Sequence, residues 1–277
     1  SHDALYLLRF VIAMPRLLYI LRTAPCTGHN GLQLYDDLLK KIINGTLNIE
    51  LNQSSWQQAL LPVRWGGLGI RSSVQLAPSA YLASAASTAL LTKQLLPERL
   101  HDVEDNSIVL TMNTWTTCSG RTEPPTASSS QKAWDDFCCK VIADELLNNA
   151  TNEIERARLL ASRADGSGDW LDALPLQAIG LKLDNESTRI AAGLRLGANL
   201  VLPHKCVCDA VVTADGLHGL SCRKSGGRHL RHNQINEIIQ RAFSSADILS
   251  TREPLGLCFG TAKRPDGITS IPWKKGR

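Results

Sequence analysis

The stretch CVCDAVVTADGLHGLSC, residues 206–222, decides how the C-terminal part of this chain folds. It holds three thiols and one imidazole close together, and these are the ligand types that tetrahedral zinc prefers. They belong to Cys206, Cys208, His218 and Cys222. Glycines at 216 and 219 flank the histidine and allow the chain to turn back on itself. The spacing predicts a structural zinc site of the knuckle type; the alternative is three buried cysteines beside an incidental histidine.

The other cysteines and the most apolar segment indicate the environment of the protein. The eight cysteines are scattered, which argues against a disulfide-stapled secreted domain and favours a reducing compartment. Residues 4–21 are the most apolar stretch, but Arg9, Pro15 and Arg16 interrupt it. We therefore expect this stretch to be soluble core, and neither a membrane span nor a signal peptide.

Positive charge is concentrated around and behind the cysteine cluster. Residues 204–277 carry 12 lysines and arginines against six acidic residues, whereas residues 1–203 carry 18 against 20. On charge alone, a polyanion partner and a simply solvated basic surface are equally good explanations. The candidate nucleic-acid contacts are Arg223, Lys224, Arg228, Arg231, His232, Lys263 and Arg264.

A helix with an apolar stripe is expected directly behind the cysteines. The stripe consists of Ile235, Ile238, Ile239 and Ala242. Arg228, Arg231 and His232 would lie in or just before its first turn, where the helix dipole disfavours cations unless an anion bridges them. A bound phosphate would supply that anion, whereas a flexible basic loop would leave these side chains in water.

The rest of the chain is predicted to be mostly helical. Apolar spacing indicates helices near residues 7–14, 32–43, 73–96, 134–147, 152–162 and 186–197. Ser72 is the expected N-cap of the third of these, and Pro78 is a possible interruption. The polar stretch 116–132, with its Pro-Pro pair and serine run, predicts a linker and a domain boundary. Strand-like sequence appears only late, near 253–259 and 267–271.

The segment KRPDG, residues 263–267, places a Pro-Asp pair between the two strand-like runs. Metal-dependent nucleases of the restriction-like fold place their first metal-binding acid in such a context, although a lone Pro-Asp-Gly is more often a β-turn. No acid follows Asp266. We therefore expect any second catalytic acid on a following strand to lie beyond Arg277. Glu237 and Glu253 are nearby acids, and no spacing rule singles out either of them.

Several of these motifs resemble one known family. The runs at 206–222, 227–233 (GRHLRHN) and 263–267 resemble the C-terminal end of non-LTR retrotransposon polyproteins that carry a restriction-like endonuclease. The phrases at 7–26, 61–71 (LPVRWGGLGIR) and 193–199 (GLRLGAN) are similar to the region behind the polymerase palm of that family. Residue 209 departs from the family, since an aspartate stands where relatives tend to have glycine, and this puts the tightness of the first turn in doubt.

The resemblance implies a layout and a set of roles. It implies a mainly α fold with a helical thumb-like region (1–115), a flexible linker (116–132), a helical linker domain (133–200), a zinc knuckle (201–226) and an incomplete α/β start of the endonuclease (227–277). Zinc would be held by the three cysteines and His218, and Mg²⁺ by Asp266 only in a complete nuclease site. Arg228, Arg231 and His232 would contact the target strand.

The family also implies partners and a location. We expect binding to target DNA and element RNA, contact with the rest of the polyprotein, no membrane, and a nuclear location with assembly possible in the cytoplasm. No paired-aspartate polymerase motif occurs, since Asp36-Asp37 and Asp135-Asp136 lie on predicted helices, so we expect no polymerase activity. Two alternatives stay open: an active Mg²⁺-dependent endonuclease that combines Asp266 with Glu253 or Glu237, and a host-retained scaffold that zinc only stabilises.

Overall fold

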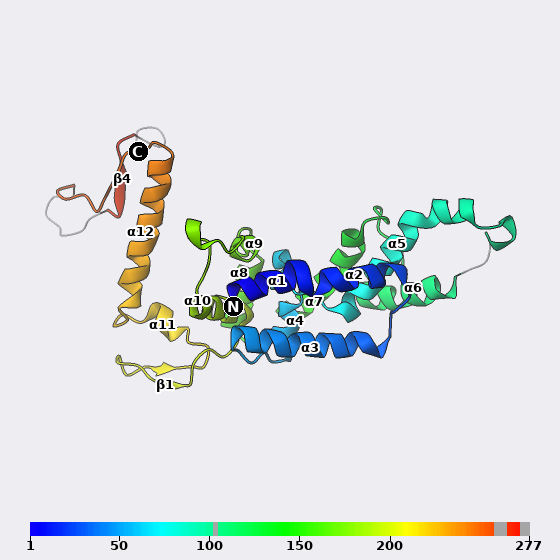
Figure 1. The fold of residues 1–277 in the computed structure, drawn as a ribbon. Coiled ribbons are helices and arrows are strands. Elements are labelled where there is room, and N and C mark those ends of the chain that lie inside the picture. Colours follow the sequence, from blue (N-terminus) through cyan, green and yellow to red (C-terminus); the bar gives the residue numbers. More distant parts are fainter. Residues whose placement is uncertain (102–104, 258–264, 272–277) are drawn as a thin grey trace. The chain divides into compact units, whose positions relative to one another are not determined.

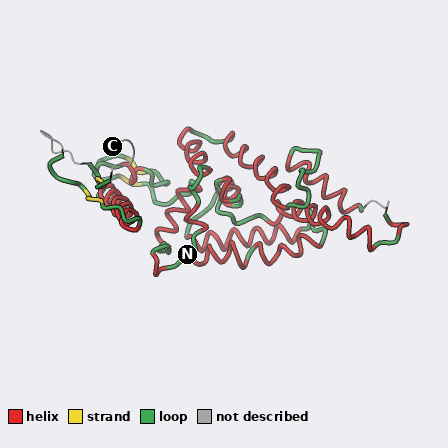
Figure 2. Tube along the Cα trace, turned by 90° about the horizontal axis from the view of Figure 1, so that it is seen from above, coloured by secondary structure: helices red, strands yellow, loops and turns green. Residues whose placement is uncertain are grey.

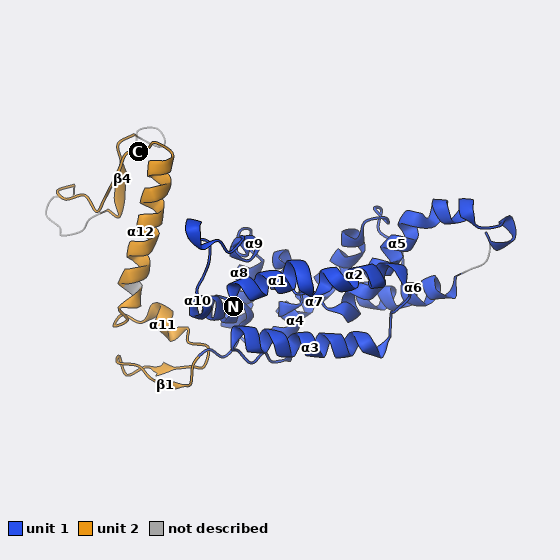
Figure 3. Ribbon diagram, viewed as in Figure 1, with its two compact units in different colours: residues 1–200 blue, residues 201–277 orange. Residues whose placement is uncertain are grey.

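A computed structural model describes residues 1–101, 105–257 and 265–271 of the chain, and within these ranges it leaves the side chain of Arg228 undescribed. The described chain is mainly helical, as the sequence predicts, with two short two-stranded sheets (Figures 1 and 2). It divides into two compact units, Ser1–Leu200 and Val201–Arg277, which are coloured separately in Figure 3.

The described residues of the first unit form only helices and loops. Its α-helices are α1 (His2–Leu7), α2 (Met14–Thr23), α3 (Asn30–Leu47), α4 (Gln53–Ala59), α5 (Ser73–Leu95), α6 (Asn106–Ser119), α7 (Gln131–Asn148), α8 (Glu153–Arg163), α9 (Asp169–Asp172) and α10 (Asn185–Leu196). A π-helical turn, η1 (Leu8–Ile12), joins α1 to α2, and the 3-10 turns are η2 (Val63–Trp65), η3 (Glu98–Leu100) and η4 (Gln177–Ile179).

The second unit contains both sheets. Its elements are β1 (His204–Lys205), β2 (Val211–Val212), α11 (His218–Ser221), α12 (Gly227–Ser245), β3 (Ser250–Arg252) and β4 (Gly267–Thr269). β1 pairs with β2 and β3 pairs with β4, both antiparallel. The prediction of a strand near 253–259 is wrong for residues 253–257, which form a bend and a turn. Residues 258 and 259 lie outside the described part of the chain.

The long helix α5 shows why the apolar and capping patterns predict the first unit well. Ser72 is its N-cap, and the Ser72 hydroxyl accepts a hydrogen bond from the Gln75 N–H at 3.1 Å. Buried Asp36 on α3 adds a second cap, since its carboxylate accepts bonds from the Ser72 hydroxyl at 2.5 Å and from the Ser73 N–H at 2.8 Å. The helix continues through Pro78 without interruption.

Apolar clusters hold these helices together. The largest contains buried residues of α1, η1, α3, α4 and α10, among them Leu5, Ile43 and Leu196. A separate cluster joins α5, α6 and α7 through Trp115 and Trp134, whose rings lie 4.7 Å apart edge to face. Trp115 lies in α6 and Trp134 in α7, on either side of the loop that joins these two helices. Residues 116–132 therefore do not divide the chain into two units.

Two of the motifs quoted for the family resemblance meet in the first unit. Arg195 on α10 donates hydrogen bonds to the carbonyls of Gly67 at 3.0 Å, Ser167 at 3.1 Å and Val63 at 2.9 Å. Gln58 donates to the carbonyls of Gly66 and Arg195. A Cβ at Gly67 would lie 2.0 Å from the Leu61 carbonyl oxygen, so only glycine fits there. We call these bonds around Arg195 the polar junction.

The N-terminal helical run contributes to the core and also exposes apolar surface. His2–Thr23 is long and apolar enough, by length and composition alone, to cross a membrane. In this structure Leu5, Leu8, Met14 and Leu21 pack into the apolar clusters. Arg9, in the middle of the run, pairs with Asp172 at 2.7 Å. The run therefore packs as a part of the first unit, and the expectation of no membrane partner stays a prediction.

Candidate metal centre

The β1–β2 hairpin places the first two cysteines. Cys206 directly follows β1, and the pairing of His204 with Val212 and of Lys205 with Val211 fixes the hairpin register. The Cys206 N–H donates to the Ala210 carbonyl at 2.9 Å, and the Asp209 N–H donates to the Cys206 carbonyl at 2.8 Å. These bonds close a tight turn that holds Cys206 and Cys208 at the tip of the hairpin.

The short helix α11 places the other two ligands. Gly216 adopts a φ of +69°, and the Asp215 carboxylate accepts a bond from the Leu217 N–H at 3.0 Å, so the chain reverses just before the helix. His218 begins α11 and Cys222 is its C-cap residue, with the Cys222 N–H donating to the His218 carbonyl at 2.9 Å. Because the two are four residues apart on one helical turn, they lie on the same face.

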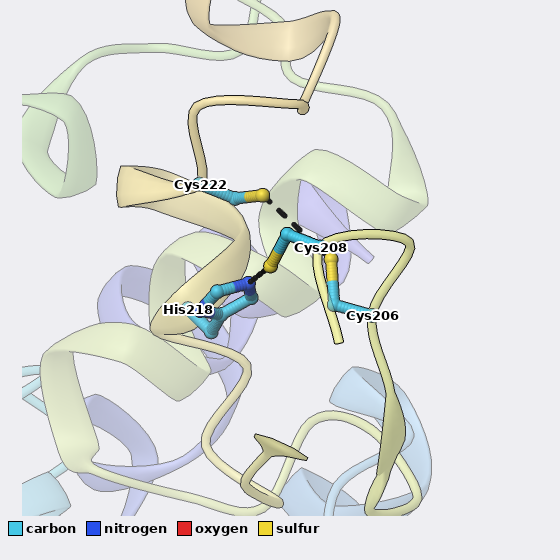
Figure 4. Close-up of side chains that lie close together, drawn as sticks. All are labelled: Cys206, Cys208, His218 and Cys222. Carbon is cyan, nitrogen blue, oxygen red and sulfur yellow. Dashed lines mark hydrogen bonds between the residues drawn. The ribbon is translucent and has the colours of Figure 1, made fainter. Parts of the chain in front are cut away.

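The four side chains converge on one point between the hairpin tip and α11 (Figure 4). Their ligand atoms all lie within 4.8 Å of one another. Cys206 Sγ is 3.6 Å from Cys222 Sγ, and Cys208 Sγ is 3.2 Å from His218 Nε2. A tetrahedral zinc with Zn–S bonds of about 2.3 Å separates two sulfurs by about 3.8 Å. The group is therefore placed to hold one metal ion of zinc-like coordination.

Local hydrogen bonds prepare one thiol as a thiolate. Bonds from the backbone N–H of Cys208 and then from His218 lower the pKa of Cys206 to about 6. The pKa of the Cys208 thiol is raised instead. The bond from the Ala210 N–H lowers this pKa, but burial and the neighbouring Cys206 and Cys222 raise it by more. A bound cation would stabilise both thiolates, since metal ligation requires the deprotonated form.

The cluster is partly enclosed. Cys222 is buried, whereas Cys206, Cys208 and His218 are half-buried. In the described ranges, no other group of three or more His, Cys, Asp and Glu side chains is placed to hold a metal ion.

No protein-family model matches this chain, and no curated protein matches it. The geometry of the cluster therefore carries the functional argument by itself.

The predicted nucleic-acid contacts lie at different places around this centre. Arg223 is exposed directly behind Cys222, and Lys224 donates to the Val207 carbonyl at 3.2 Å. Arg231 donates to the Leu220 carbonyl, so it ties α12 to α11. Lys263 and Arg264 fall outside the described residues.

The helix α12 begins earlier in the sequence than the pattern of its basic residues predicts. Since it starts at Gly227, Arg228 lies in its first turn, but Arg231 and His232 lie in its second turn, contrary to the expectation. Gly226 offers no side-chain cap to the free N–H groups of the first turn. The apolar stripe is not covered by the described part of the chain, because Ile235, Ile238 and Ile239 are all exposed.

Asp266 lies beside His232 of α12 and, through its backbone, beside Glu253. Its Oδ1 is 3.3 Å from Nε2 of His232, and the Asn236 side-chain nitrogen is 3.1 Å from the same ring nitrogen. The Glu253 N–H donates to the Asp266 carbonyl, since both flank the β3–β4 pair. Sequence reasoning missed the pairing of His232 with Asp266, because no spacing rule connects a helix to a turn so far along the chain.

Proposed function

We propose that the second unit is a zinc-organised nucleic-acid-binding unit, of the kind found near the C-terminus of non-LTR retrotransposon polyproteins. The observation that carries this proposal is the convergence of Cys206, Cys208, His218 and Cys222, whose ligand atoms lie within 4.8 Å of one another. Zinc in this group has a structural role, because four protein ligands leave no open position for a substrate. The ion would join the hairpin tip to α11.

The zinc centre supports nucleic-acid binding through the residues that follow it. Arg223 and Lys224 directly follow the last ligand, and α12 starts three residues later with an uncapped N-terminus and Arg228 in its first turn. Phosphate oxygens bind well at such a place, because free backbone N–H groups and cationic side chains both attract them. The expected partners are the target DNA and the element RNA.

The salt dependence of binding tests this function. Fluorescence anisotropy with a labelled DNA duplex and a labelled RNA hairpin gives the affinity of the whole chain at several salt concentrations. We expect the affinity to fall steeply as the salt concentration rises. In Arg223→Gln/Lys224→Gln, the slope of log affinity against log salt concentration should become shallower by about one unit for each phosphate contact that is lost. The matched control is Lys41→Gln/Lys93→Gln, which removes two exposed cations from the first unit. Affinity independent of salt, or equal slopes in both double variants, would reject the proposal.

The magnesium-nuclease alternative finds less support. In the described ranges Asp266 pairs with His232, and no group of three or more metal-type side chains forms around it. A nicking assay with Asp266→Ala as the control still decides the matter, because equal products from both proteins would dismiss Asp266 as a metal-binding acid. Glu253 lies next to Asp266 through a backbone hydrogen bond, but because these two acids belong to no larger metal-type group in the described ranges, we expect binding without cleavage.

A scaffold function is the second candidate, because the first unit exposes large apolar side chains. Tyr19 on α2 is 75% exposed, and Leu34 and Leu38 on α3 are 70% and 56% exposed. A protein partner would cover such a surface. Chelation separates the two functions: removal of zinc should abolish nucleic-acid binding through the second unit, whereas a partner bound to the first unit should stay bound.

A further inference from the structure

A cationic surface cavity lies in the first unit, far along the sequence from the basic C-terminal segment. Its volume is about 510 Å³, and α2, α5, α7 and the 62–71 loop contribute to its wall. Five of its lining side chains are cations and one is an acid: Arg9, Arg22, Arg64, Arg71, Lys132 and Asp135. The first unit has a surplus of acids as a whole, so this concentration of cations is local.

The charges of this cavity are only partly compensated. Arg64 pairs with Asp136, and Arg71 pairs with Asp135 at 2.5 Å. Among the described residues, the Arg22 guanidinium donates only to the neutral amide oxygen of Gln131, at 2.8 and 2.9 Å. Neither Arg22 nor Lys132 forms an ion pair with any acid in the part of the chain that the structure describes. At least two positive charges are therefore available to a ligand.

The backbone adds to the positive potential. Helix α7 begins at this cavity with Gln131 and Lys132, and its N-cap Ser130 makes no side-chain hydrogen bond. A lysine in the first turn of an 18-residue helix opposes the helix dipole, so an anion at this point would relieve the repulsion. Arg9, whose side chain is 5% exposed, also lines the cavity, and its Nε has no hydrogen-bond partner among the described residues.

The rest of the wall is apolar and suits more than a bare anion. Met14, Leu18, Pro62 and Leu76 line the same cavity. Its volume falls in the range of cavities that bind small organic ligands. A second cavity of about 290 Å³ shares Arg22 and Gln131 with the first and is lined by serines at 84, 87 and 129. A ligand with a phosphate and a flat apolar group satisfies both kinds of surface.

From these observations we propose that the first unit binds a nucleoside phosphate, with its phosphate between Arg22 and Lys132 and its base against the apolar wall. The ligand is either a free nucleotide or the phosphorylated end of a strand, since both offer the same chemistry. This site is independent of the metal centre, because every residue that lines it lies in the first unit.

Isothermal titration calorimetry on the full chain tests the proposal, with adenosine monophosphate, adenosine and inorganic phosphate as probes. We expect adenosine monophosphate to bind more tightly than either adenosine or phosphate, since only it uses both surfaces. In Arg22→Gln/Lys132→Gln its affinity should fall at least about tenfold, because charge-assisted bonds to phosphate are lost. Both residues are exposed, so the variant should fold, which circular dichroism verifies.

The matched control is again Lys41→Gln/Lys93→Gln, which removes the same charge but lies outside both cavities. It should keep the affinity of the wild type. A 5′-phosphorylated single-stranded dodecamer, compared with its unphosphorylated form, distinguishes a strand end from a free nucleotide. Undetectable binding of both adenosine monophosphate and the phosphorylated dodecamer, or equal losses in the two double variants, would overturn the proposal.

Discussion

Asp209 occupies a backbone conformation that normally belongs to glycine. Its φ is +68°, in the left-handed region, and its N–H closes the turn that holds Cys206 and Cys208. The short polar side chain of aspartate tolerates this region better than most side chains do. The turn therefore closes with an aspartate at this position, although the sequence puts its tightness in doubt.

A pair of substitutions at this position tests the turn. Asp209→Val should lower the apparent zinc affinity about tenfold, because a β-branched residue in the left-handed region costs about 1–2 kcal/mol and metal binding is coupled to folding of the site. Asp209→Gly should keep or raise the affinity, since glycine adopts this φ freely. Competition with a chromophoric chelator measures both values. Equal zinc affinities for the valine and glycine variants would show that zinc binding does not depend on this turn.

A second prediction at the scale of a single residue concerns Asp36. Its buried carboxylate accepts bonds from Ser72 and Ser73 at the start of α5, and it is 5% exposed. Asp36→Ala removes the acceptor of the Ser72 hydroxyl and of the Ser73 N–H, whereas the Ser73 hydroxyl keeps its bond to the Leu32 carbonyl, so we expect a loss of about 2–3 kcal/mol in the free energy of unfolding. Urea denaturation followed by circular dichroism measures it. The exposed neighbour Asp37, replaced by alanine, should change the free energy by less than about 0.5 kcal/mol.

At the scale of elements, local patterns predict the helices but not all of their contacts. The apolar spacing and the Ser72 cap predict α3 and α5, and both form. The cap from Asp36 was missed, because it depends on α3 packing beside α5. The strand expected from residue 253 was placed wrongly, because Glu253 takes a φ of +42° and Gly256 one of +81°. Apolar spacing does not reveal such backbone turns, so β3 ends at Arg252.

The polar junction connects three segments through one side chain. Arg195 is 8% exposed, and its guanidinium reaches carbonyls of Val63, Gly67 and Ser167. The fork of the guanidinium allows three directions at once, which a lysine ammonium on its single stem does not match. Sequence patterns showed the two motifs but gave no sign that they meet.

This difference leads to a prediction about the junction. Arg195→Lys should lower the free energy of unfolding of the first unit by about 2 kcal/mol, because buried carbonyls lose their donors. Chemical denaturation of the whole chain measures the change. Arg156→Lys is the control, since Arg156 is exposed and its side chain makes a single long bond to the described residues, 3.5 Å to the Leu147 carbonyl. A loss in the control as large as that in the Arg195 variant would contradict the role of the junction.

At the scale of the whole molecule, the two units have different sources of stability. The first unit has several apolar clusters, whereas the helix α12 of the second unit exposes Ile235, Ile238 and Ile239. The described part of the second unit thus has little core of its own, and a metal ion would supply binding energy that its side chains lack. The cysteine and histidine spacing predicted the ligand cluster from sequence, since its residues are close along the chain.

The zinc content of the purified chain tests the central claim most directly. Elemental analysis by mass spectrometry should find about one zinc per wild-type chain, and close to none in Cys208→Ser, because the tetrahedral site loses a ligand. Cys118→Ser is the control, since Cys118 is an exposed free cysteine outside the cluster, and it should keep its zinc. A zinc content near zero in the wild type, or one unchanged in Cys208→Ser, would contradict the account.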